Sequence, residues 1–195
     1  ALAGYAFSRM RFQGRRVGLI AIILIQMFPQ MLMMVAIYLA VFWLGQYVPF
    51  LGLDTHAGLI LVYMGGAMGA NVWLTKNYFD TIPRSLEESA MLDGATPLQI
   101  LVYIIIPLAV PILVVVFFLQ FIAIYSEFIL ARVLLTSEHK LTMAVGLQSF
   151  IGDQYGKRWG IFSAAALIST FPVLILFWLL QKQLVTGLTS GAVKN

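Results

Sequence analysis

The sequence predicts an all-α membrane protein, built as a polytopic bundle of transmembrane helices. Hydrophobic residues fill 61% of its 195 positions and charged residues only 10%, whereas soluble domains carry about 25% charged residues. Four stretches are long and apolar enough to cross a bilayer, which takes about 20 residues. The charge content is too low for a water-soluble surface, so the chain is predicted to lie in a membrane.

The charge and the cysteine content of the chain exclude several classes of function. The net charge is +4 and the pI is near 9.5, but Lys and Arg in a membrane protein mark its cytoplasmic side. No nucleic-acid partner is therefore expected. There is no cysteine, which excludes a disulfide framework and a thiolate metal site. His56 and His139 lie far apart and lack metal-ligand spacing, so no metal site is expected.

The first predicted span runs from Val17 to Leu44. No charged residue occurs from Val17 through Leu53. Pro29 should kink this helix, because proline removes a backbone hydrogen bond and clashes with the preceding turn. The opening segment from Ala1 resembles the end of a helix already under way. We therefore expect the chain to be an N-terminally shortened part of a longer protein.

Three further spans follow the first. They are predicted at Ala57–Lys76, Tyr103–Leu130 and Trp159–Gln181. Gly65, Gly66 and Gly69 in the second span would let another helix approach closely. Pro172 should kink the last span.

The basic residues near helix ends predict the orientation in the membrane. Four arginines between residues 9 and 16 precede the first span, Lys76 and Arg84 flank the next polar loop, and two lysines lie near the C-terminus. Those eight residues would be cytoplasmic, against four in an external loop at 132–158. The segment Pro83–Gln99 and the C-terminus are therefore predicted to be cytoplasmic.

The polar segment Pro83–Gln99 contains residues that typically begin and end helices. Ser85 and Glu88 have the spacing of a capping box, which predicts a helix over Leu86–Asp93. Gly94 suits the left-handed conformation that ends such a helix. Thr96, Pro97 and Gln99 then have the pattern of a second capped start. These residues alone leave two interpretations open, an ordered loop that binds nothing and a docking surface for a partner.

The same segment resembles the signature loop of ABC-importer permease subunits, which reads E-A-A, three residues, G, nine residues, I-x-L-P. Here Glu88-Ser89-Ala90 is followed after three residues by Gly94, and after nine more by Ile104-Ile105-Ile106-Pro107. Ser89 stands for the first alanine and Ile106 for the leucine. In that family the segment is a coupling helix that docks on a cytoplasmic ATPase subunit. The resemblance implies these ATPase-coupling residues: Glu87, Glu88, Ala90, Gly94 and Ala95. For the two glutamates, ordinary first-turn capping is the alternative role.

Other segments narrow the resemblance to the permeases of carbohydrate importers. They are "YAFSRMRFQGRR", "IQMFPQM", "YVPFLGLDTHAGLI", "AVGLQSF" and "GLTSGAVKN". The resemblance covers residues 1–195 and implies a single transmembrane domain of the ABC importer permease type, in a bacterial or archaeal inner membrane. The implied substrate is maltose or maltodextrin, with trehalose, another oligosaccharide or glycerol phosphate as alternatives. The closing "GLTSGAVKN" is expected to reach the ATPase.

The resemblance also implies the partners. They are a second permease subunit, two ATPase subunits that use ATP and Mg²⁺, an extracytoplasmic sugar-binding protein and membrane lipid. This chain would itself bind no cofactor and catalyse no reaction, because the Gly-rich "YMGGAMGAN" lacks the lysine of a phosphate-binding loop. A membrane-embedded enzyme would need a nucleophile, a metal motif or paired carboxylates at membrane depth. Glu127 is the only carboxylate predicted there. A stand-alone channel leaves the coupling segment without a role.

Polar side chains within spans are costly and tend to face a cavity or a partner helix. Those predicted to line a substrate path are Tyr63, Asn71, Gln120, Tyr125 and Glu127. The amides would bond sugar hydroxyls and the tyrosines would stack on a pyranose ring. Glu127, in a "YSEF" segment that resembles the family's W-N-E-F, would be a gate or an ion-pair partner of Arg132. Interhelical hydrogen bonding is the alternative for each residue.

Overall fold

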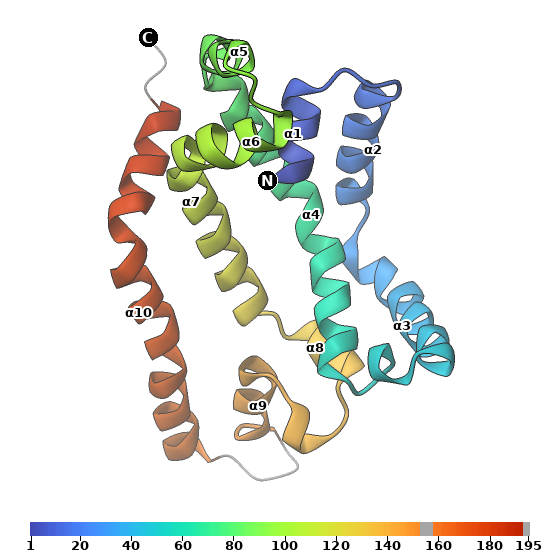
Figure 1. Cartoon of the computed structure of the whole chain (residues 1–195). Coiled ribbons are helices and arrows are strands. Elements are labelled where there is room, and N and C mark those ends of the chain that lie inside the picture. Colours follow the sequence, from blue (N-terminus) through green and yellow to red (C-terminus); the bar gives the residue numbers. More distant parts are fainter. Residues whose placement is uncertain (153–157, 193–195) are drawn as a thin grey trace. The chain divides into compact units, whose positions relative to one another are not determined.

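A computed structural model describes residues 1–152 and 158–192 of the chain (Figure 1). All regular structure in these residues is helical, which confirms the predicted fold class. The longer α-helices are α1 (Leu2–Arg9), α2 (Arg15–Met27), α3 (Gln30–Tyr47), α4 (His56–Thr81), α5 (Arg84–Leu92), α7 (Ile106–Tyr125) and α10 (Trp159–Ala192). The shorter ones are α6 (Pro97–Ile100), α8 (Ile129–Leu134) and α9 (Met143–Ser149).

Three helical segments within the described residues are long and apolar enough to cross a membrane. They are His56–Thr81, Pro97–Tyr125 and Trp159–Gly187, and α2 with α3 would make a fourth span if the two helices are counted as one. The structure thus agrees with a multi-pass membrane protein. Within α10 the helix continues across Pro172.

The first predicted span is two helices and not one kinked helix. Helix α2 ends at Met27, α3 begins at Gln30, and Phe28 and Pro29 are non-helical. Proline lacks an N–H donor and disfavours helical backbone in the residue before it, so the strain at Pro29 is relieved by a break. Pro29 then serves as the first residue outside α3, and its carbonyl accepts a bond from the Leu32 N–H at 3.0 Å.

The third predicted span is shifted toward the N-terminus. Its helix begins at Pro97, contains a π-helical turn over Leu101–Ile105, and ends at Tyr125 instead of Leu130. The π turn lies directly before Pro107, whose missing N–H such a widened turn can accommodate. The helix ends early, at Tyr125, because the Glu127 carboxylate accepts hydrogen bonds from N–H groups in the first turn of α8. The chain therefore starts a new helix instead of extending the old one.

The chain forms two compact units, each with its own core. The first unit comprises Ala1–Gln26, Met68–Leu119 and the chain from Leu179, and the second comprises Met27–Ala67 and Gln120–Trp178. The core of the first unit is formed by Tyr5, Phe79, Ile82, Ile100, Leu101, Ile105 and Ala109. The core of the second unit is formed by Val41, Leu59, Ala131, Leu134, Leu135 and Val145. Many other large apolar side chains are exposed, as expected for a surface in contact with lipid.

Close helix approach occurs at a glycine that the sequence analysis did not single out. A Cβ on Gly187 of α10 would lie 2.7 Å from the Pro111 carbonyl oxygen of α7, so only glycine fits there. By contrast, a Cβ on Gly65 or Gly66 would meet no described atom within 4 Å. The predicted close approach is therefore absent from the described part of the chain at these two residues. It is present at Gly69, where a Cβ would lie 2.6 Å from Gln26 Nε2 of α2.

Candidate functional site

The helix of the polar segment begins two residues earlier than predicted. Helix α5 starts at Arg84, with Pro83 as its N-cap and no side-chain capping bond. Ser85 therefore lies inside the first turn, and the predicted Ser85–Glu88 capping box is wrong. Pro83 is favourable in this role because its fixed φ of −58° and its extended ψ of 130° lead the chain into the helix.

The end of α5 is a glycine stop, as predicted. Gly94 has a φ of +83°, a conformation that residues with a Cβ rarely adopt. The Gly94 N–H donates to the Met91 carbonyl at 3.0 Å and the Ala95 N–H donates to the Ala90 carbonyl at 2.9 Å. This pair of bonds is a Schellman motif. No other described atom lies within 4 Å of a Cβ placed on Gly94, so the backbone angle, and not space, requires glycine.

The second helix start is also as predicted. The Gln99 N–H donates to Thr96 Oγ1 at 3.4 Å, and the Thr96 N–H donates to Gln99 Oε1 at 2.8 Å. This is a complete capping box with Pro97 at the first helical position. The chain therefore turns sharply between α5 and α6 with its backbone donors satisfied.

The tip of this turn presents an apolar surface to the outside. Leu92 is 90% exposed, and Met91, Leu98 and Tyr103 are exposed as well. A shallow hollow beside them is lined by Asp93, Gly94, Ala95, Gln99, Ile100, Tyr103 and Ile104. Of the predicted coupling residues, Glu88 and Gly94 are exposed, whereas Ala90 and Ala95 are half-buried against the core of the first unit.

Glu87 is buried on the side of α5 that contacts α1. Its side chain is 6% exposed and forms an ion pair with Arg9 of α1. The Arg9 Nε donates to Glu87 Oε1 at 2.5 Å, and the Tyr5 hydroxyl donates to Glu87 Oε2 at 3.5 Å. The sequence around Arg9 predicts only a cytoplasmic position for it, because nothing local to Arg9 or Glu87 identifies the other residue.

Two of the predicted path residues lie together. The Tyr63 hydroxyl of α4 donates to Glu127 Oε2 at 2.6 Å. The same carboxylate accepts from the N–H groups of Leu130 at 2.8 Å and Ala131 at 3.0 Å. Glu127 therefore caps α8 and fixes Tyr63. In the described part of the chain its partners do not include Arg132, so the predicted ion pair is not formed.

The other three path residues lie elsewhere. The Tyr125 hydroxyl donates to the Ser169 carbonyl of α10 at 2.7 Å, and its ring stacks on Phe121 with centroids 5.5 Å apart. Asn71 and Gln120 are half-buried, the first in the first unit and the second in the other. The structure brings Tyr63 and Glu127 together, and the prediction that the five residues line a substrate path stays a prediction.

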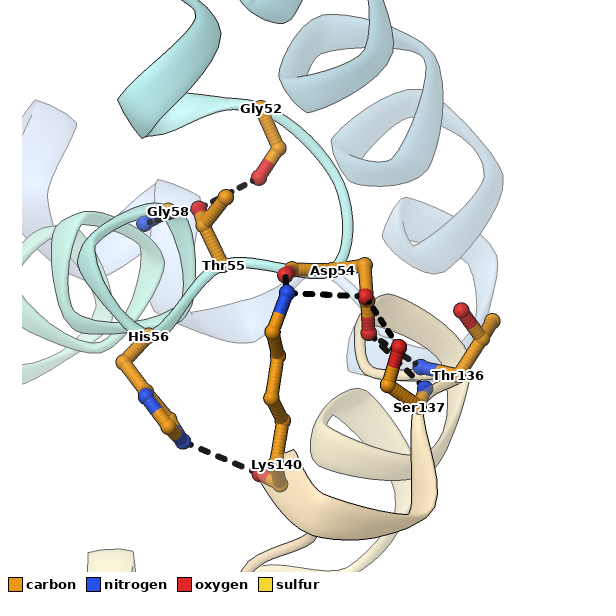
Figure 2. A network of polar contacts seen from close by, with 8 residues as sticks. All are labelled: Gly52, Asp54, Thr55, His56, Gly58, Thr136, Ser137 and Lys140. Carbon is orange, nitrogen blue, oxygen red and sulfur yellow. Dashed lines mark hydrogen bonds and ion pairs between the residues drawn. The ribbon is translucent and has the colours of Figure 1, made fainter.

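A polar network that the sequence analysis missed joins the loop before α4 to the segment after α8 (Figure 2). Asp54 Oδ1 accepts from the N–H groups of Thr136 and Ser137, both at 2.9 Å. Its Oδ2 accepts from Ser137 Oγ at 2.5 Å and from Lys140 Nζ at 3.0 Å. His56 Nε2 lies 3.0 Å from the Lys140 carbonyl oxygen and completes the network.

The conformation and the charge of Asp54 both depend on this network. Asp54 has a φ of +55°, which is uncommon for a residue other than glycine, and its N–H donates to the Leu134 carbonyl at 2.8 Å. The hydrogen bonds from Ser137, with those from Lys140 and Thr136, hold the pKa of the Asp54 carboxyl well below its usual range. The turn residues around "GLDTH" could have indicated a loop, but not its distant partner.

Comparison with known proteins identifies the class to which this fold belongs. A family model described as "Binding-protein-dependent transport system inner membrane component" matches residues 1–187. The chain belongs to this family of inner-membrane transport components.

Individual relatives agree with that assignment. The maltose/maltodextrin transport system permease protein MalG of Vibrio vulnificus strain YJ016 is 50% identical over 193 residues, and MalG of Escherichia coli K12 is 49% identical over 191 residues. These matches cover 99% and 98% of this chain, and the chain spans 64% of the length of each relative. A solved bacterial ABC transporter, involved in the import of the acidic polysaccharide alginate, superimposes with a TM-score of 0.74 and 31% identity, covering 92% of this chain and 65% of that one.

Proposed function

We propose that this chain is the permease subunit of an ATP-driven sugar importer and forms half of its translocation pathway. The observation that carries the proposal is the segment from α5 to α6. This segment is a turn with a capped helix start and an exposed apolar tip. It lies between helices whose exposed surfaces are otherwise apolar, as expected in lipid. Membership of the transport family and the spacing from Glu88 through Gly94 to Pro107 support the same role.

The coupling step follows from this geometry. Two ATPase subunits in the cytoplasm bind and hydrolyse ATP with Mg²⁺, and one of them docks on the tip around Leu92 and the hollow beside Gly94. The Schellman turn and the capping box fix the angle between α5 and α6, so a push on α5 is passed to the helix that continues into α7. The subunit itself supplies no ATP chemistry. This role places Pro83–Gln99 and the C-terminus in the cytoplasm, in agreement with the positive-inside rule.

The remaining partners complete the transporter. A second, MalF-like permease subunit forms the other half of the pathway, and a sugar-binding protein delivers substrate on the external side. Tyr63 and Glu127 stand at one end of the path, where their hydrogen bond joins α4 to the start of α8. The expected contact of the C-terminal segment with the ATPase falls partly on residues 193–195, outside the described residues.

Maltose or maltodextrin is the proposed substrate, since relatives about half identical to this chain are named for that sugar. Another oligosaccharide, trehalose or glycerol phosphate is the alternative. The structural relative named for alginate import supports the wider carbohydrate class.

The test is uptake by the complete transporter. The full-length subunit is reconstituted in vesicles with its second permease subunit, ATPase and binding protein, and ATP is enclosed on the ATPase side. We expect ATP-dependent uptake of labelled maltodextrin that unlabelled maltose suppresses and glycerol phosphate does not. Uptake of trehalose or glycerol phosphate in preference to maltodextrin would establish the alternative, and absence of ATP-dependent uptake of any of these solutes would contradict the proposal.

A further inference from the structure

Helix α1 is attached to both sides of the junction between α4 and α5. Arg9 Nη2 donates to the Ile82 carbonyl at 2.8 Å, in the linker after α4, while its Nε binds Glu87 in the first turn of α5. A guanidinium is planar and holds its donors in a fixed fork. One arginine side chain therefore sets the position of the linker carbonyl relative to the α5 carboxylate.

Further contacts of α1 fix the last turn of α4. The Ser8 hydroxyl donates to Asp80 Oδ1 at 2.6 Å, and Asp80 also forms an ion pair with Lys76. The Tyr5 ring packs edge-on against Phe79 at 6.4 Å. Both Tyr5 and Phe79 belong to the buried core of the first unit. The end of α1 and the end of α4 thus form one packed body, to which Arg9 attaches α5.

The ion pair is shielded from solvent on both sides. The side chain of Arg9 is 7% exposed and that of Glu87 is 6% exposed. Removing one partner of such a pair leaves an uncompensated buried charge, which is far more costly than losing a surface pair. A separation of α5 from α1 would break the pair while both groups are still surrounded by protein, so the pair resists any movement of α5 alone.

We propose that Arg9 and Glu87 are a positioning pair that makes α5 move together with α1 and the end of α4. On this proposal, which rests on the coupling role of α5, Glu87 acts within the subunit and does not contact the ATPase. Glu88, one residue along and exposed, lies on the side open to a partner. The movement of α5 is then transmitted through three helix ends instead of through the turn at Gly94 alone.

The experiment uses the complete reconstituted transporter and two readouts. The first is the number of sugar molecules imported per ATP hydrolysed, for Glu87→Gln, Arg9→Gln and the double variant. We expect each single variant to lower this ratio about fivefold or more. The double variant should be no worse than either single one, because residues that act as a unit are not additive. Arg9→Lys keeps the charge but not the fork, and should give an intermediate ratio.

The second readout does not depend on transport. Because the chain has no cysteine, spin labels can be placed at Met10 and Leu86, both exposed, to measure the distance between the end of α1 and the first turn of α5. We expect one narrow distance distribution in every nucleotide state of the otherwise unchanged chain, and a broad one for Glu87→Gln. Arg11→Gln, which removes an exposed arginine two residues from Arg9, should leave both readouts unchanged.

Each outcome decides the proposal. An unchanged ratio together with a narrow distribution in Glu87→Gln would overturn it while leaving the coupling role of α5 intact. A transporter that fails to couple even without substitutions would refute the proposed function, and the distance measurement would still show whether the pair holds α5. Only protein that elutes as a single species in detergent is measured, so misfolding does not imitate either result.

Discussion

Glu87 and Glu88 are neighbours in the sequence and differ completely in environment. Successive residues of a helix point about 100° apart, so Glu87 is buried against Arg9 while Glu88 is exposed. Two acidic residues in a first turn are compatible with capping, docking or ion pairing. The sequence therefore predicted both as coupling residues and could not separate them, because the arginine that does so is about eighty positions away.

Asp54 gives a prediction on pH. Its folded-state pKa lies well below the usual range, chiefly through the hydrogen bonds from Ser137, so its contribution to stability is complete above the ordinary pKa of about 3.9. It is lost as the pH falls through the lower folded-state pKa. Asp54→Asn should melt a few degrees below the wild-type chain in detergent at pH 7.

The difference in melting temperature between wild type and Asp54→Asn should stay constant from neutral pH down to about 5 and shrink only below about 4. Asp93→Asn is the matched control, because Asp93 is exposed and its side chain has no bond among the described contacts. A difference that disappears near neutral pH, or an equal effect of Asp93→Asn, would refute the assigned role of the Asp54 network.

For the helices α5 and α6, the ends that depend on contacts between near neighbours in the sequence were predicted correctly. The Thr96–Gln99 box and the stop at Gly94 each lie within a few residues and were predicted correctly. The start of α5 was wrong because Pro83 outcompetes Ser85 as the N-cap. A proline at that place needs no capping side chain, and the serine pattern alone does not show this.

The turn between α5 and α6 gives the second prediction. Gly94→Val should retain insertion and ATP hydrolysis but lower sugar uptake several-fold, because a β-branched residue at a φ of +83° costs about 1–2 kcal/mol and shifts the turn. Uptake and hydrolysis are measured together in reconstituted vesicles. Gly14→Val is the control, since Gly14 has a φ of +85° and equally open surroundings. Equal loss of uptake in both variants would mean that backbone strain, and not the coupling turn, is responsible.

At the scale of the whole molecule, composition and hydropathy were enough to predict an all-helical membrane protein. They could not predict the break at Pro29 or the helix end at Tyr125. The break at Pro29 depends on whether the helix bends at the proline or ends before it. The helix end at Tyr125 depends on the hydrogen bonds between the Glu127 carboxylate and the next helix. The contacts that hold the second unit together, such as Asp54 with Ser137 and Tyr63 with Glu127, join residues more than sixty positions apart. Periodicity within one helix carries no information about such pairs.

Docking of the ATPase on the tip of α5, as proposed, can be tested directly by cross-linking. A single cysteine at Leu92, in a chain that otherwise has none, is cross-linked in the complete transporter in each nucleotide state. We predict a cross-link to the ATPase subunit in at least one state, and none from a cysteine at Phe50, which is exposed in the loop predicted to be external. Failure of the Leu92 cysteine to reach the ATPase in every nucleotide state, or equal cross-linking from Phe50, would contradict the claim.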